Sequence, residues 1–155
     1  MEGVHIRHAT AGDIRKMSHL MVCLTEKYIT LGLADDVKAK VLASFSVDGL
    51  VKAFSEQCDY FVAVADKRIV GVIGMKETSH LYHLFVAEAF QGRGLANQLW
   101  QVAKKNALNM QNLTHFTVNS AVSAQTVYKN WGFRVINGVR TREGFSDVPM
   151  KLDLV

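Results

Sequence analysis

The sequence predicts an α/β fold in which a mixed sheet of seven strands is flanked by about four helices. Two patterns predict it: short runs of branched and aromatic residues, typical of strands, and longer segments whose apolar residues recur every three or four positions, typical of amphipathic helices. Along the chain these patterns follow the order βααβββαβαββ. Residues 1–155 contain no repeat, low-complexity tract or linker. We therefore expect one domain, long enough to bury about two-thirds of its unfolded surface.

The first third of the chain predicts one strand followed by helices. Residues 4–9 alternate like a strand, and Thr10 with an acid three places later, Asp13, is typical of a helix start. The apolar spacing that follows predicts a helix over residues 11–28. Two apolar clusters in residues 31–58 indicate short helices: Val37, Val41, Leu42 and Phe45 in the first, and Leu50, Val51 and Phe54 in the second, which starts near Ser46 or Asp48.

The central part predicts three strands and a helix. Residues 60–65 and 68–75 form a hairpin across the polar turn at residues 66–67, and residues 80–86 form the next strand. Apolar residues then recur at helical spacing and would form one stripe of a helix: Leu95, Leu99, Val102, Ala103 and Ala107. The last third predicts a strand over residues 114–119, a short helix over 123–130 that ends at Gly132, and two strands, 133–136 and 148–152, separated by a polar loop.

Composition excludes several classes of protein. Hydrophobic residues make up 49% of the chain and charged residues 21%, which is typical of a soluble globular protein. No apolar run is long enough to span a bilayer, and the N-terminus lacks the layout of a signal peptide. We therefore expect a cytoplasmic protein without a membrane partner.

The charged, histidine and cysteine residues indicate an anionic ligand and no metal. The net charge is +4, but the basic residues are spread along the chain rather than gathered in a run, so no nucleic-acid partner is expected. The six histidines show none of the spacings of a metal site. Cys23 and Cys58 lie in apolar segments without C-x-x-C spacing, so we expect small buried thiols rather than a disulfide.

The turn between the strand at 80–86 and the following helix is typical of an anion-binding site. Gly92 and Gly94 allow the backbone to approach a ligand closely, and the N–H groups at the start of the helix carry partial positive charge. Arg93 adds a full positive charge. A phosphate or pyrophosphate suits such a turn.

Known phosphate-binding motifs narrow the choice of ligand. A P-loop is excluded because neither Lys nor Ser/Thr follows Gly94, and a dinucleotide fingerprint matches weakly because its last position is Asn97. Residues 91–96, Gln-Gly-Arg-Gly-Leu-Ala, resemble the Q/R-x-x-G-x-G/A pyrophosphate motif of the GNAT superfamily of acyl-CoA-dependent N-acyltransferases. For these six residues alone, a turn that binds no ligand remains an alternative.

A second segment strengthens the resemblance. Val118-Asn119-Ser120, followed by Ser123-Ala124, Tyr128 and Gly132-Phe133, is similar to the segment in which the family's sheet splays open and a helix carries a tyrosine. The ends of the chain also resemble the family, so the likeness covers nearly all of it and implies a GNAT-like fold with a splay between the two central strands. One departure is Glu88, where the family often has proline.

The resemblance implies that acetyl-CoA is the co-substrate. Backbone groups of the strand at 80–86, above all of Phe85 and Val86, would hold the pantetheine arm, and the turn would hold the pyrophosphate. The cofactor contacts that it implies are Leu84, Phe85, Val86, Gln91, Gly92, Arg93, Gly94, Leu95, Ala96, Asn97, Asn119, Ala124 and Tyr128. Phe85 and Val86 are also suited to a purely structural role in the strand.

Two catalytic roles are implied as well. An amine with a pKa of about 10.4 is neutral in only about one molecule in a thousand near pH 7.4, so a base must take its proton. The candidates are His80, on the strand before the turn, and Glu77, and a structural histidine is an equal alternative. Strand alternation predicts His80, Tyr82, Leu84 and Val86 on one face and His83 on the other. Tyr128 would donate a proton to the departing CoA sulfur.

The resemblance thus implies an N-acetyltransferase that moves acetyl from acetyl-CoA to a primary amine by direct attack in a ternary complex. One alternative is a CoA-binding sensor without turnover, and another is a phosphate-binding module unrelated to CoA. The acceptor is expected to be a small-molecule or peptide amine, bound by residues 25–58 and 137–147. A homodimer is compatible with the sequence.

Overall fold

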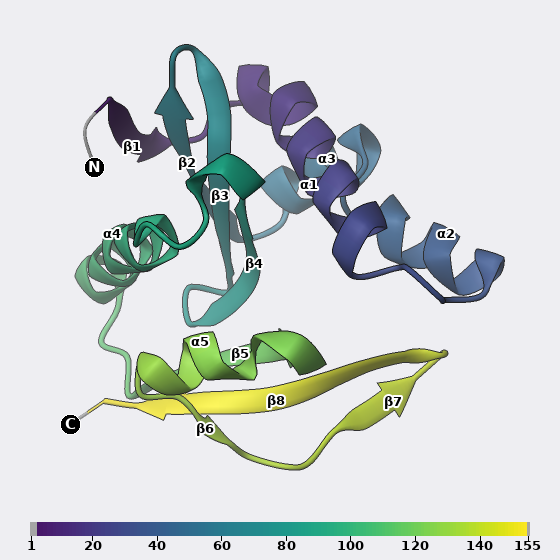
Figure 1. Cartoon of the computed structure of the whole chain (residues 1–155). Coiled ribbons are helices and arrows are strands. Elements are labelled where there is room, and N and C mark those ends of the chain that lie inside the picture. The colour runs from purple at the N-terminus through teal and green to yellow at the C-terminus, as the bar shows by residue number, and fades with distance from the viewer. Residues whose placement is uncertain (1–2, 155) are drawn as a thin grey trace.

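The computed structural model, which describes residues 3–154, contains one eight-stranded sheet and five α-helices (Figure 1). The strands are β1 (Val4–His8), β2 (Cys58–Ala65), β3 (Arg68–Lys76), β4 (His80–Val86), β5 (His115–Ala121), β6 (Arg134–Val135), β7 (Arg140–Arg142) and β8 (Phe145–Asp153). The helices are α1 (Ile14–Tyr28), α2 (Asp35–Ala43), α3 (Val47–Ser55), α4 (Leu95–Met110) and α5 (Gln125–Asn130). Single 3₁₀ turns η1 (Ala11–Asp13), η2 (Glu88–Phe90) and η3 (Val122–Ala124) precede α1, α4 and α5.

The sheet is mixed and splays open at its centre. Its strand order is β1-β2-β3-β4-β5-β8-β6, with β7 paired to β8, and only β4 and β5 run parallel. These two strands pair at two positions alone, His80 with Thr117 and Leu81 with Val118. Beyond Leu81 they diverge, which confirms the predicted splay between the central strands.

Helices cover both faces of the sheet and enclose two apolar cores. Helices α1 and α3 pack on one face of β2, β3 and β4, through Ile14, Met17, Met21, Leu24 and Leu50. Helix α4 packs on the opposite face (Figure 1), where five of its side chains are buried: Leu95, Leu99, Trp100, Ala103 and Ala107. The α4 stripe therefore agrees with the predicted one, except that Trp100 is buried and Val102 only half-buried.

The start of α1 follows the predicted capping pattern. The Asp13 carboxylate accepts a hydrogen bond from the Thr10 backbone N–H at 2.7 Å, and the Arg7 guanidinium binds the same carboxylate through two further bonds. The Arg7 hydrogen bond is the main reason that the pKa of Asp13 falls to about 2. This fixes the turn that joins β1 to the first helical layer.

Three expectations need correction. The sheet has eight strands, because residues 140–142 form β7 and residues 145–147 begin β8 where a polar loop was expected. The two strands are joined by a tight turn in which Glu143 and Gly144 both have positive φ, as a two-residue hairpin requires. There are five α-helices rather than about four, and α2 and α3 are the two short helices indicated for residues 31–58. Cys23 is exposed, since it lies on the solvent side of α1, while Cys58 is half-buried. None of the helices within residues 3–154 is long and apolar enough to cross a membrane.

Candidate active site

The splay between β4 and β5 opens into a cavity of about 570 Å³. Its walls come from α1, β4, β5, α5 and β8. Seven of the residues predicted to bind the cofactor line it: Leu84, Phe85, Val86, Gln91, Asn119, Ala124 and Tyr128. Because the parallel pairing stops at Leu81, the edge of β4 that faces this cavity has no neighbouring strand.

The pairing of β4 with β3 determines which backbone groups face the cavity. Ala87 N–H donates to Val70 O at 2.8 Å, and the register continues with Val86 opposite Gly71 and Phe85 opposite Val72. In an antiparallel pair, hydrogen-bonded and non-hydrogen-bonded positions alternate. The backbone groups of Phe85 therefore point to β3, whereas those of Leu84 and Val86 point to the cavity. Phe85 contributes its side chain to the wall, and its backbone is engaged elsewhere.

The turn at one end of the cavity exposes unpaired N–H groups. Gly92 and Gly94 have φ values of 72° and 83°, and Gly94 is the N-cap of α4. The first bond of the helix runs from Gln98 N–H to Gly94 O, so the N–H groups of Leu95, Ala96 and Asn97 have no partner within α4. A Cβ added at either glycine would meet no atom within 4 Å. The space beside these N–H groups is therefore open to an anion.

The side chains of the same turn fold back onto its backbone. The Gln91 amide donates to Val86 O at 2.9 Å, and the Arg93 guanidinium donates to Ala89 O at 3.2 Å while lying over the Phe90 ring. The turn is thus held by its own side chains, and Arg93 keeps its charge next to the helix start.

Glu88, which stands where the family often has proline, ties this turn to α1. Its carboxylate accepts two hydrogen bonds from Lys27 Nζ, at 2.8 and 2.9 Å, and one from the Tyr28 hydroxyl at 2.7 Å. The Lys27 bond is the main cause that lowers the pKa of Glu88. The contact joins residues about sixty positions apart, so no local motif indicates it.

Tyr128 lies on the wall opposite β4. It is buried, and burial alone raises its pKa to about 12. Its ring meets Trp131 and Phe133 edge-on, with ring centres 5.5 and 5.8 Å away, and Trp131 in turn stacks on Trp100 of α4. These aromatic contacts fix the position of the ring, and the hydroxyl stays protonated at neutral pH.

A bulge in β4 moves His80 to the face of the sheet on which His83 lies. The register passes from Gly74 opposite His83 to Met75 opposite Leu81, which leaves Tyr82 without a partner. His80 Nδ1 lies 2.7 Å from Thr117 Oγ1. Thr117 is on the face of β5 opposite to its core residues, so His80 lies on that face as well. The prediction that His80 shares a face with Leu84 and Val86 is therefore wrong, because an extra residue in one strand shifts the alternation.

His83, which the sequence assigned to the far face, lies in the cavity wall, whereas His80 and Glu77 do not. The Tyr60 hydroxyl is 2.8 Å from His83 Nδ1, and Phe45 and Tyr82 pack on the His83 ring. Desolvation is the main cause that lowers the pKa of His83 to about 3, so this imidazole is neutral. Desolvation also lowers the pKa of His80.

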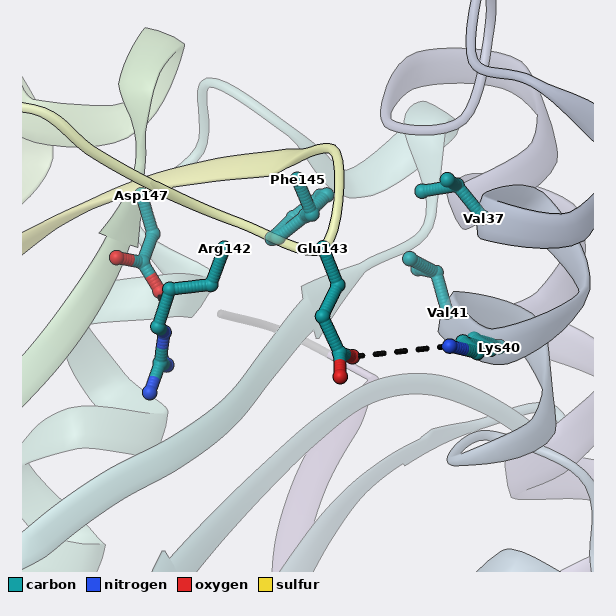
Figure 2. A pocket seen from close by; sticks show the side chains of 7 residues that line it. All are labelled: Val37, Lys40, Val41, Arg142, Glu143, Phe145 and Asp147. Carbon is teal, nitrogen blue, oxygen red and sulfur yellow. Dashed lines mark ion pairs between the residues drawn. The ribbon is translucent and has the colours of Figure 1, made fainter.

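A second cavity, of about 500 Å³, lies between α2 and the hairpin of β7 and β8 (Figure 2). Val37, Lys40 and Val41 of α2 face the hairpin of β7 and β8 across it, and Lys40 lies 3.9 Å from Glu143 at the tip of that hairpin. Phe145 lines both cavities. Among residues 3–154 no group of three or more His, Cys, Asp and Glu side chains is placed to hold a metal ion.

Three solved structures that are similar to this chain are N-acetyltransferases. An N-acetyltransferase from Rhodopseudomonas palustris superposes with a TM-score of 0.81 at 16% identity, covering 99% of this chain and 98% of its own. The PaiA N-acetyltransferase from Thermoplasma acidophilum, solved with coenzyme A, gives 0.80 at 15% identity, covering 97% and 99%. A spermidine N-acetyltransferase chimera built partly from the Vibrio cholerae enzyme gives 0.67 at 17% identity, covering 98% and 96%.

At these identities the structural matches establish the fold alone, and no curated protein sequence matches the chain. The family is established by the sequence itself. Residues 12–154 match the model of the acetyltransferase (GNAT) domain, which includes the turn at α4, both splayed strands and Tyr128. The chain therefore belongs to the GNAT acetyltransferase family.

Proposed function

We propose that this protein transfers an acetyl group from acetyl-CoA to a primary amine, by direct attack within a ternary complex. The observation that carries the proposal is the continuity of the cavity: it runs from Gln91 at the turn, along the unpaired edge of β4, to Tyr128. One ligand with a diphosphate at one end and a thioester at the other would match the groups along this path. Family membership supports acyl transfer in general, and the amine acceptor is part of the proposal.

Each group along the path has a role that its chemistry suits. The N–H groups of the turn and of the first turn of α4 would bind the diphosphate. The backbone groups of Leu84 and the N–H of Val86 would hold the pantetheine arm as a neighbouring strand would, while the Val86 carbonyl already accepts a hydrogen bond from Gln91. The acceptor nitrogen attacks the thioester carbonyl carbon, and the carbon–sulfur bond then breaks. Tyr128 would donate a hydrogen bond to the departing sulfur, and the proton lost by the amine passes to solvent.

Ligand binding gives the first test. A ligand that binds the native state alone stabilises it by RT ln(1 + [L]/Kd), about 4 kcal/mol at a thousandfold excess over Kd. For a domain of this size we expect millimolar acetyl-CoA to raise Tm by roughly 10 °C, and NADH and ATP to raise it much less. Equal shifts with all three would indicate a general nucleotide site. Release of free thiol when amines are added then tests turnover.

Replacement of His80 by alanine separates a structural from a catalytic role. A base would matter most at low pH, where the amine is protonated, so the loss of rate would shrink as pH rises. Because His80 bonds Thr117 and does not line the cavity, we expect instead a loss of stability and a change in rate that is independent of pH. The Thr117→Val variant removes the same hydrogen bond from the other side and should behave alike. A pH-dependent loss in His80→Ala alone would make His80 the base.

A CoA-binding sensor without turnover is the second candidate. It needs the turn and the β4 edge but gains nothing from a buried phenol that stays protonated. The two functions differ in one measurement, because a sensor would bind acetyl-CoA and release no thiol with any amine.

A further inference from the structure

The inner end of the cavity, away from the turn at α4, is built from aromatic side chains. Phe45, Tyr82, His83 and Phe145 line it. Phe45 packs edge-on against His83, with ring centres 4.9 Å apart, and Tyr82 stacks on His83 at 4.0 Å. An acceptor that reaches the thioester from this end therefore contacts mainly rings.

This wall carries no formal charge. None of the residues that line the cavity is Asp, Glu, Lys or Arg, and His83 is neutral. Acidic groups beside it already have partners. Glu88 is bound by Lys27 at the α1 side. In the adjoining cavity Asp147 is bound by Arg140, and Glu143 lies 3.9 Å from Lys40. A positive charge does lie close, since Lys76 Nζ is 5.0 Å from the centre of the Tyr82 ring.

An uncharged wall with a lysine nearby discriminates between classes of amine. The nitrogen that attacks the thioester must be neutral when it reacts, so it needs no acid in the wall. A second ammonium on the same molecule would stay charged, and burying a charge without a partner is costly. A diamine or polyamine would therefore bind poorly, whereas an apolar or aromatic group would gain from burial against the rings.

Phe145 comes from a different part of the fold than the other aromatic residues of this wall, since Phe45 and Tyr82 both pack on His83. It is half-buried and belongs to neither apolar core among residues 3–154. It follows the tight turn of the hairpin (Figure 2) and lines both cavities. Its position suits contact with a ligand that enters either cavity.

We propose that the acceptor is a monoamine whose amino group is joined to an apolar or aromatic group, and that Phe145 is a specificity-determining contact for that group. The proposal rests on the acetyl transfer proposed above and names its substrate class.

The test compares two amines, 2-phenylethylamine and 1,4-diaminobutane, at saturating acetyl-CoA. We expect kcat/KM to favour the aromatic amine by about tenfold to a hundredfold, the range that one apolar contact region supplies. Phe145→Asp replaces the ring in the wall with a carboxylate, so it should reduce kcat/KM for 2-phenylethylamine about tenfold or more and raise it for the diamine. Phe145→Leu keeps the wall apolar and should keep the order of preference.

Val139→Asp is the matched control, because Val139 is 58% exposed and lines neither cavity. It adds the same charge near the hairpin and should leave both values unchanged. A wild-type preference for the diamine, or an unchanged ratio in Phe145→Asp, would overturn the inference while the acetyl transfer stands.

Failure of the acetyl transfer itself would look different, since neither amine would then release thiol from protein that binds acetyl-CoA. In that case, titration calorimetry of the two amines into the CoA-saturated protein decides the inference. Tighter binding of 2-phenylethylamine supports it, and equal or reversed affinities overturn it.

Discussion

Replacing Gly94 by glutamate is expected to weaken acetyl-CoA binding by at least about a hundredfold. Gly94 is the N-cap of α4, and a Cβ there points into open space beside the unpaired N–H groups. The new carboxylate would lie where the diphosphate should bind, and like charges in contact cost several kcal/mol. Because the φ of Gly94 is 83°, a side chain also strains the turn by about 1–2 kcal/mol. Titration calorimetry measures the loss of affinity, and urea unfolding measures the strain.

Gly94→Asn separates these two effects. Asparagine adopts the left-handed conformation more readily than other side chains and carries no charge, so it should retain most of the affinity that glutamate destroys. If Gly94→Glu bound acetyl-CoA with wild-type affinity in a folded protein, the diphosphate would lie elsewhere.

The parts of the fold that the sequence predicts correctly depend on local patterns. The stripe on α4 and the glycines of the preceding turn lie within a few residues of one another, so their spacing alone indicates helix and turn. Strand β7 has no such signal, because Arg140–Arg142 contains only polar residues and so shows no alternation of apolar and polar side chains. It becomes a strand by pairing with β8. Its tight turn at Glu143 and Gly144 resembles an ordinary polar loop in the sequence.

The parts of the site that the sequence misses depend on pairing between distant segments. The pairing of β4 with β3 shifts by one residue at Tyr82, and this bulge moves His80 onto the face of His83. The choice of Leu84 over Phe85 as the residue with free backbone groups follows from the same register. The hydrogen bond between Glu88 and Lys27 joins two segments that lie far apart in the sequence, and no sequence pattern relates them. The glycine turn and Tyr128, in contrast, could be predicted as site residues because each lies within a compact motif.

Tyr128→Phe is expected to lower kcat about a hundredfold, the low end for a general acid, while acetyl-CoA affinity stays nearly the same. The variant removes only the hydroxyl and keeps the ring contacts with Trp131 and Phe133. A thiol has a pKa of about 8.5 by analogy with cysteine, whereas burial raises the pKa of Tyr128 to about 12. Full proton transfer from the phenol to the thiolate is therefore uphill by about 5 kcal/mol.

The phenol should consequently act as a hydrogen-bond donor to the charge that develops on sulfur, and complete the transfer only late. Such an interaction exists mainly in the transition state, so its loss reduces kcat and leaves binding unaffected. Because the raised pKa keeps the phenol protonated, the wild-type rate should show no fall from ionisation of Tyr128 between pH 8 and pH 10, roughly two units below that pKa. Single-turnover kinetics with an amine for which chemistry limits the rate measure the effect. If Tyr128→Phe kept wild-type kcat under those conditions, Tyr128 would serve to pack the wall, and the proton would come from water.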